Sequence, residues 1–130
     1  MAHPNEELLR KGYEAFANYD LETIQQLFAD DIVWHVVGGN NQLTGTIKGR
    51  DEVFGWFAKL LTLSEGTFKI DVHDIVANDN HTIVLSTDTA QRGDKHLKVE
   101  AVAVYHIENN QAKEAWFFNS DAAQDDEFFA

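Results

Sequence analysis

Residues 32–39, IVWHVVGG, join six positions typical of a strand to a pair of glycines that ends it. The residues just before them, LFADD, resemble the end of a helix, so the stretch marks a change from helix to strand. Successive side chains of a strand point to opposite faces, and Trp34 and His35 are therefore expected on opposite sides of a sheet. At most one of the two can face a given pocket, and the predicted function depends on which of them does so.

Helical patterns flank this strand on both sides. In residues 5–19, Leu9, Tyr13 and Phe16 follow the 4,3 spacing of a single helical face. Asp20 is a typical N-cap residue for a second, shorter helix. A third helix, from about residue 51 to residue 63, has apolar residues around most of its circumference, which indicates that it is largely buried.

From residue 67 onward the apolar residues recur with a period of two. One strand is predicted after residue 67, and three more over residues 81–91, 96–107 and 112–119, separated by RGDK and ENNQ. Helices followed by consecutive strands with short connections are typical of an α+β domain with an antiparallel sheet. We expect residues 1–130 to form one domain. Because long antiparallel strands twist and coil, its sheet should be strongly curved, with three N-terminal helices packed in the concave face. Such a sheet encloses a cavity.

The composition excludes several classes of partner. Ten basic and 22 acidic residues give a net charge of −12, which repels nucleic-acid phosphates and anionic membranes. The chain has no cysteine, and its six histidines show no zinc-motif spacing, so we expect no disulfide, metal or cofactor. No signal peptide and no apolar run of about 18 residues is visible, which predicts a cytoplasmic protein.

Residues 16–57 resemble the front half of the SnoaL-like polyketide cyclase group, which belongs to the nuclear transport factor 2-like superfamily together with ketosteroid isomerases and limonene epoxide hydrolases. The resemblance implies a cone-shaped α+β barrel. It says less about function, because one fold supports many activities. The features that carry it are Asp20-Leu21 after a short loop, LFADD at residues 27–31, an aromatic residue on the next strand, Leu43, Gly45 and Gly49 before a helix, and Glu114-Ala115-Trp116 near the end.

The residues of the best-known enzymes of this superfamily are not matched. The general-base aspartate of ketosteroid isomerases falls at Val36, and their oxyanion-binding tyrosine falls at Gly12, beside Tyr13. The strand over residues 97–107, which corresponds to the one with their second acid, has no aspartate. Limonene epoxide hydrolases need an arginine between two aspartates on neighbouring strands, and no arginine is expected on a central strand here.

The cyclase resemblance implies an aromatic cavity with one acidic residue for proton transfer. Asp121, just after the last strand, is our first catalytic candidate; the alternative is a solvated residue beside Asp125 and Asp126. His35 is the second, with a structural role on the outer face of the sheet as the alternative. The resemblance turns Trp34 inward. The residues predicted to bind a ligand are Tyr13, Phe16, Trp34, Val36, Trp56, Leu60, Tyr105, Trp116 and Phe118.

Three functions stay open at this point. The protein can be a cofactor-free cyclase, isomerase or hydratase acting on a small hydrophobic molecule, a non-catalytic protein that binds such a molecule, or a dimerisation domain with a vestigial cavity. Both faces of the last two strands are apolar, although helices cover only one face of the sheet. We therefore predict a homodimer joined through an outward patch. The residues assigned to that patch are Val102, Val104, Ala115 and Phe117.

Overall fold

The structure is a computed structural model that describes residues 2–130. These residues form helices packed against one six-stranded sheet, and none of the helices is long and apolar enough to cross a membrane. In chain order the elements are α1 (Pro4–Ala17), α2 (Leu21–Leu27), β1 (Phe28–Val36), β2 (Gly45–Lys48), α3 (Arg50–Leu63), β3 (Lys69–Ala77), β4 (His81–Arg92), β5 (Lys95–Glu108), β6 (Gln111–Asn119) and α4 (Ala122–Phe128).

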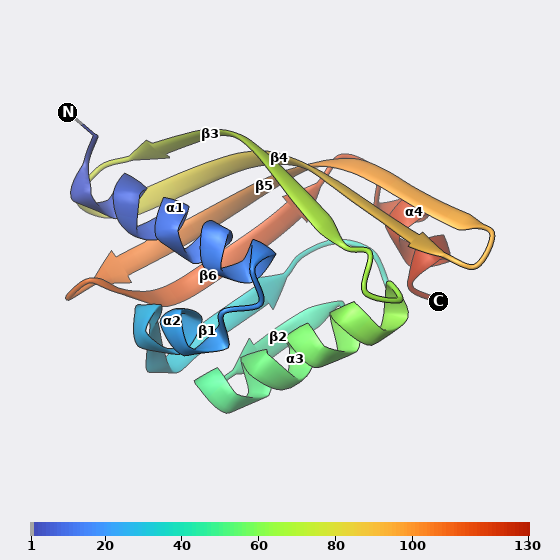
Figure 1. The fold of residues 1–130 in the computed structure, drawn as a ribbon, viewed down its shortest axis with the longest axis horizontal. Coiled ribbons are helices and arrows are strands. Elements are labelled where there is room, and N and C mark those ends of the chain that lie inside the picture. Colours follow the sequence, from blue (N-terminus) through green and yellow to red (C-terminus); the bar gives the residue numbers. More distant parts are fainter. Residues whose placement is uncertain (1) are drawn as a thin grey trace.

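The sheet is curved, and its strand order is β2-β1-β6-β5-β4-β3. Helices α1, α2 and α3 lie along its concave side, and α4 lies at the opposite end of the molecule from the N-terminus (Figure 1). This arrangement confirms the predicted α+β fold. The sheet is mixed rather than wholly antiparallel, because the last strand, β6, inserts between β5 and β1 and runs parallel to β1.

The boundary between α2 and β1 differs from the prediction. Asp20 caps α2 as expected, its carboxylate accepting a hydrogen bond from the backbone N–H of Thr23 at 3.2 Å. The helix nevertheless ends at Leu27, and Phe28 already belongs to β1, where it pairs with Ala112 of β6. The expectation that LFADD ends a helix was wrong for Phe28 and the three residues after it. Pairing with a distant strand, which local sequence does not reveal, decides the conformation there.

Helix α4 was not predicted. Asp121 caps this short helix by accepting a hydrogen bond from the backbone N–H of Gln124 at 3.0 Å. Phe128 and Phe129, each 2% exposed, bury the end of this segment. They belong to a second apolar cluster, beside the main core, whose other buried members are Leu43, Leu60, Ala90, Leu97 and Val99.

The faces of β6 correct the predicted dimer patch. Ala115 is fully buried and Phe117 packs on Trp34, with ring centroids 4.2 Å apart, so both point inward. The prediction placed them on the outer face together with Val102 and Val104. This was wrong because Ala115 and Phe117 pair with Tyr105 and Ala103, and residues opposite each other on neighbouring strands point to the same face. The outward neighbours of Val102 and Val104 are Phe118 and Trp116, respectively.

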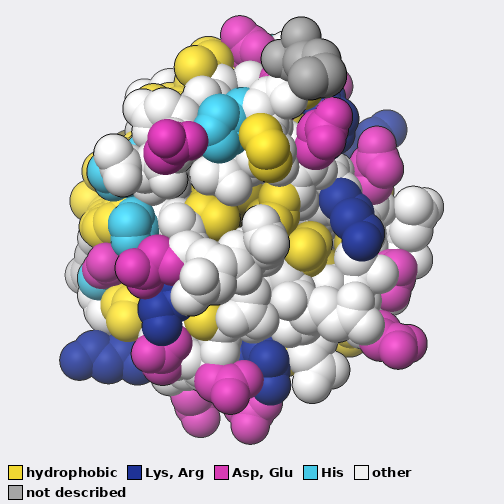
Figure 2. Space-filling view, turned by 90° about the vertical axis from the view of Figure 1, so that its left-hand side faces the viewer, with side chains coloured by type: hydrophobic (Ala, Val, Ile, Leu, Met, Phe, Trp, Pro, Cys, Tyr) yellow, Lys and Arg dark blue, Asp and Glu magenta, His cyan; other side chains and the backbone are white. Residues whose placement is uncertain are grey.

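The end of the molecule that carries the N-terminus is largely polar at its surface. Acidic side chains are scattered around this end, with histidines and small groups of hydrophobic side chains between them (Figure 2). On this face the acidic side chains are thus spread out rather than gathered in one patch.

Candidate functional site

A cavity of about 160 Å³ lies between the concave face of the sheet and the helices. Its volume is close to the roughly 150 Å³ of an apolar protein cavity that holds one benzene ring. All of the predicted ligand-binding residues except Trp116 line it. These are Tyr13, Phe16, Trp34, Val36, Trp56, Leu60, Tyr105 and, at the rim, Phe118.

Trp34 and His35 occupy opposite faces of β1. Trp34 points inward and is 3% exposed, and its indole nitrogen is buried without a hydrogen-bond partner among the described residues. His35 points to the other face, where its Nε2 lies 2.6 Å from Glu114 Oε2 and its Nδ1 lies 3.1 Å from Thr46 Oγ1. Its ring stacks on Trp116. His35 and Trp116 therefore lie outside the cavity.

Two tyrosines meet in the cavity wall. Tyr13 on α1 and Tyr105 on β5 share a hydrogen bond between their hydroxyl oxygens, 2.8 Å apart. One hydroxyl hydrogen makes this bond, which leaves the other available to a ligand, since no further hydrogen bond joins either hydroxyl to the described part of the chain. Burial raises the pKa of both groups, so the pair is neutral and can donate.

Asp88 on β4 places a carboxyl group in the same cavity wall. Burial raises its pKa to about 6, and the nearby carboxylates of Asp125 and Glu100 act in the same direction. The Ser86 hydroxyl donates a hydrogen bond to Asp88 Oδ1 at 2.9 Å, which partly offsets this rise. A carboxyl with such a pKa exists in both protonation states near neutral pH, as proton transfer requires.

Asp88 was not predicted from the sequence. The signal that could have found it is the period of β4, in which the inward positions are Thr82, Val84, Ser86, Asp88 and Ala90. An aspartate on an inward strand face whose other side chains are small and uncharged is a candidate for a buried acid.

The acidic residues of the C-terminal segment take different positions. Asp121, the predicted proton carrier, is exposed and caps α4, and it does not line the cavity. Asp125, one helical turn later, does line it, and burial raises its pKa. The structure thus brings Asp88, Asp125 and the Tyr13–Tyr105 pair to one cavity, while Asp121 and His35 lie outside it.

In residues 2–130 no cluster of three or more His, Asp or Glu side chains is arranged to hold a metal ion.

The chain belongs to the family of the SnoaL-like domain, which matches residues 9–115. It is similar to Bal32a, encoded by a soil-derived mobile gene cassette, with 31% identity, a TM-score of 0.92 and coverage of 97% of this chain and 96% of the other. An uncharacterised protein of Mycobacterium tuberculosis is 26% identical over 95% of both chains. IdmH of Streptomyces antibioticus, assigned as a polyketide cyclase, has a similar fold, with 18% identity, a TM-score of 0.75 and coverage of 91% and 93%. The predicted family and fold are confirmed.

Proposed function

We propose that this protein binds a small, flat, mainly apolar molecule with a carbonyl oxygen, and that it catalyses cofactor-free acid/base chemistry of the cyclase or isomerase type with Asp88 as the proton-transfer residue. The observation that carries the proposal is a carboxyl group with a pKa of about 6 in the wall of an aromatic cavity. The fold shared with IdmH supports the reaction class by analogy.

The polar groups of the cavity support a simple proton relay. The carbonyl oxygen of the ligand accepts the free hydroxyl hydrogen of the tyrosine pair, which lowers the cost of negative charge on that oxygen. The Asp88 carboxylate takes a proton from the carbon beside the carbonyl, and the electrons of the C–H bond form an enolate. In a β,γ-unsaturated ketone the enolate is a dienolate, and return of the same proton from Asp88 to its far carbon shifts the double bond. When the enolate carbon instead attacks a second carbonyl, a C–C bond closes the ring, the π electrons of that carbonyl form an alkoxide, and the alkoxide takes the proton from Asp88.

Binding is tested by tryptophan fluorescence. Trp34 and Trp56 both line the cavity, with ring centroids 5.8 Å apart, so a ring ketone such as 1-indanone should quench the emission in a saturable manner. Indane, which lacks the oxygen, should bind more weakly. If neither compound nor a wider panel of one- and two-ring ketones changes the fluorescence, the proposal is wrong.

Catalysis is tested by exchange of the acidic α-hydrogens of 1-indanone in D₂O. Asp88→Asn keeps the shape and the acceptor for Ser86 but removes the acid, and should slow the exchange roughly 100-fold or more. Asp121→Asn and His35→Gln test the two candidates selected from the sequence, and both should stay near the wild-type rate because neither residue lines the cavity. A slow Asp121→Asn variant would instead restore Asp121 as the proton carrier.

A non-catalytic binding protein is the second candidate. It is favoured by the crowding of aromatic rings around Trp34, whose indole contacts the rings of Phe28, Phe57 and Phe117. This crowding leaves little space in which a bound ligand could rearrange. Saturable binding of 1-indanone without protein-dependent exchange of its hydrogens would support this function over the catalytic one.

We also propose a cytoplasmic homodimer joined through the outer face of the sheet. The corrected outward patch contains Val102, Val104, Trp116 and Phe118, of which Val102 is 37% and Phe118 is 43% exposed. A two-fold contact would cover this patch on both subunits. Val104→Asp should convert the dimer to a monomer in light scattering, and a monomeric wild-type protein at micromolar concentration would contradict the proposal.

A further inference from the structure

The cavity reaches the surface beside α4. Most of its lining is buried, but Val37 at the end of β1 is 42% exposed, and Asn119 at the end of β6 and Asp125 in α4 are only half-buried. The loop of residues 38–42 follows Val37, and α4 follows β6, so these two segments border the mouth of the cavity. Figure 1 shows α4 at this end, away from the N-terminus.

The two segments are held together by the carboxylates of α4. Asp126 Oδ1 accepts hydrogen bonds from the backbone N–H of Asn40 at 2.7 Å and from the side-chain amide of Asn41 at 2.9 Å. The Asn41 amide also reaches Asp125 Oδ2 at 3.4 Å, and the Gln42 amide donates to the backbone oxygen of Ala130 at 3.1 Å. We call the two bonds of Asp126 the latch. Side-chain bonds at the surface exchange readily with water, so such a contact can open without unfolding the sheet.

Phe129 closes the cavity from the same side. Its ring is 2% exposed and forms part of the cavity wall, whereas the equally buried Phe128 next to it does not line the cavity. With Phe129 in place the cavity, at about 160 Å³, suits a compact one- or two-ring ligand such as 1-indanone. A larger ligand needs this side chain to move, and the side chain moves with α4.

We propose that α4 is a lid over the mouth of the cavity, that the Asp126 latch fastens it to the loop of residues 38–42, and that Phe129 sets the upper size of the ligand. On its other side the lid is tied to β4 and β5, because Arg92 and Lys95 donate hydrogen bonds to the backbone oxygens of Phe128, Ala130 and Glu127. The size limit rests on the proposed ligand binding. The lid itself does not, because it can be observed in the free protein.

Gly39 offers a specific way to open the latch. It has a positive φ of 76°, and a Cβ atom added there would lie 2.5 Å from Asp126 Oδ1, so alanine must displace the carboxylate. Gly38 has nearly the same φ, 81°, and nothing within 4 Å of an added Cβ. Gly38→Ala therefore causes the same backbone strain without touching the latch, which makes it a matched control.

The lid is tested by hydrogen exchange of the peptide over residues 121–130 in the free protein. Gly39→Ala and Asp126→Ala should each raise the exchange rate of its helical amides roughly tenfold above that of Gly38→Ala, because both hydrogen bonds of the latch are weakened. Equal exchange in Gly39→Ala and Gly38→Ala would overturn the latch. So would an Asp126→Ala variant that exchanges like the wild type.

The size limit is tested with two neutral probes, 1-indanone and the three-ring N-phenyl-1-naphthylamine. Phe129→Ala should improve binding of the three-ring probe roughly tenfold relative to 1-indanone, because one ring-sized volume is freed. Phe128→Ala removes an equally buried ring outside the cavity wall and should not change this ratio. Equal ratios in both variants would overturn the role of Phe129. Failure of both probes with every variant would instead remove the proposed ligand binding, while the exchange result would still decide the lid.

Discussion

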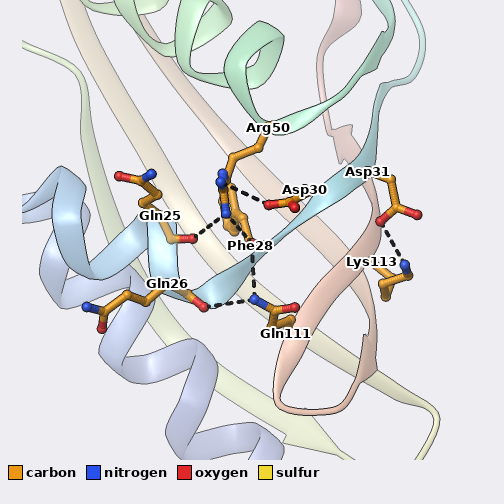
Figure 3. Close-up of polar contacts among 8 residues, drawn as sticks. All are labelled: Gln25, Gln26, Phe28, Asp30, Asp31, Arg50, Gln111 and Lys113. Carbon is orange, nitrogen blue, oxygen red and sulfur yellow. Dashed lines mark hydrogen bonds and ion pairs between the residues drawn. The ribbon is translucent and has the colours of Figure 1, made fainter.

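The two ends of this barrel share one kind of polar contact and differ in another. At the end where α2 runs into β1, donors bind backbone carbonyls: Arg50 Nη1 reaches the oxygens of Gln25 at 3.3 Å and Phe28 at 3.4 Å (Figure 3). Gln111 donates to the oxygen of Gln26 at 3.2 Å. The last carbonyls of a helix have no partner within it, so these side chains satisfy groups that α2 leaves open. We call this the sealed end.

At the mouth, carboxylates accept hydrogen bonds from a glycine-containing loop. Arginine and glutamine do not titrate near neutral pH, whereas burial raises the pKa of Asp88 and Asp125 at the mouth. Donors also bind backbone carbonyls at the mouth, where Arg92 reaches the oxygens of Phe128 and Ala130 and Lys95 reaches that of Glu127. The two ends therefore differ in the carboxyl groups of the mouth, whose charge can change near neutral pH.

The largest effect is expected at the mouth, from Asp88→Asn. The pKa of Asp88 is raised from 3.8 to about 6, so the folded protein binds this proton more tightly than the unfolded chain does. The stability gained from that proton is complete below the unfolded pKa and is lost as the pH rises through about 6. The wild type should therefore lose about 3 kcal/mol relative to Asp88→Asn over this range. Urea unfolding of both proteins at acidic and at weakly alkaline pH measures the difference, and parallel pH curves would contradict it.

At the sealed end, Arg50→Ala should destabilise the protein by about 2 kcal/mol, because the carbonyls of Gln25 and Phe28, the latter part-buried, lose a charged donor. Arg50→Lys should recover only part of this, since an ammonium group cannot reach several acceptors as the planar guanidinium does. The loss should be the same at every pH at which Asp88 titrates, which urea unfolding of the variants can establish. A loss that follows the titration of Asp88 would show that the two ends are coupled.

A smaller effect is expected from the cap of α4. Asp121→Ala removes the acceptor for the Gln124 backbone N–H and should cost about 1 kcal/mol. Asp121→Asn should cost little, because asparagine caps helices as well as aspartate does. Thermal unfolding of the two variants separates a capping role from a charge effect. Equal losses in both variants would mean that the charge of Asp121, rather than its cap, stabilises α4.

The smallest effect is expected from the ion pair of Lys113 and Asp31, whose Nζ and Oδ1 atoms are 2.7 Å apart (Figure 3). The Asp31 side chain is 73% exposed, and an exposed pair contributes little to stability. Lys113→Met should leave the unfolding midpoint unchanged. It should, however, raise the pKa of Asp31, which the hydrogen bond from Lys113 now lowers. Carboxyl-carbon NMR titration detects that shift, and an unchanged pKa would contradict the role of the pair.

Local patterns in the sequence were sufficient for much of this protein. The alternation of β1 separated Trp34 from His35, the 4,3 spacing of α1 aligned Tyr13 with Phe16, and Asp20 marked the start of α2. Each of these outcomes depends on residues a few positions apart, because side-chain direction and helix capping are set by the local backbone. The resemblance to the SnoaL-like family supplied the cone-shaped form of the barrel and the inward direction of Trp34.

Only the tertiary structure decided the chemistry of the site. The pKa of Asp88 rises because the surrounding strands and helices exclude water, and α4 forms where Phe128 and Phe129 meet a cluster that includes Leu43 and Leu97. The face of Phe117 likewise depends on how β6 pairs with β1 and β5. Burial, strand pairing and the docking of a short helix arise between residues far apart in the chain, and so no short stretch of the sequence contains them.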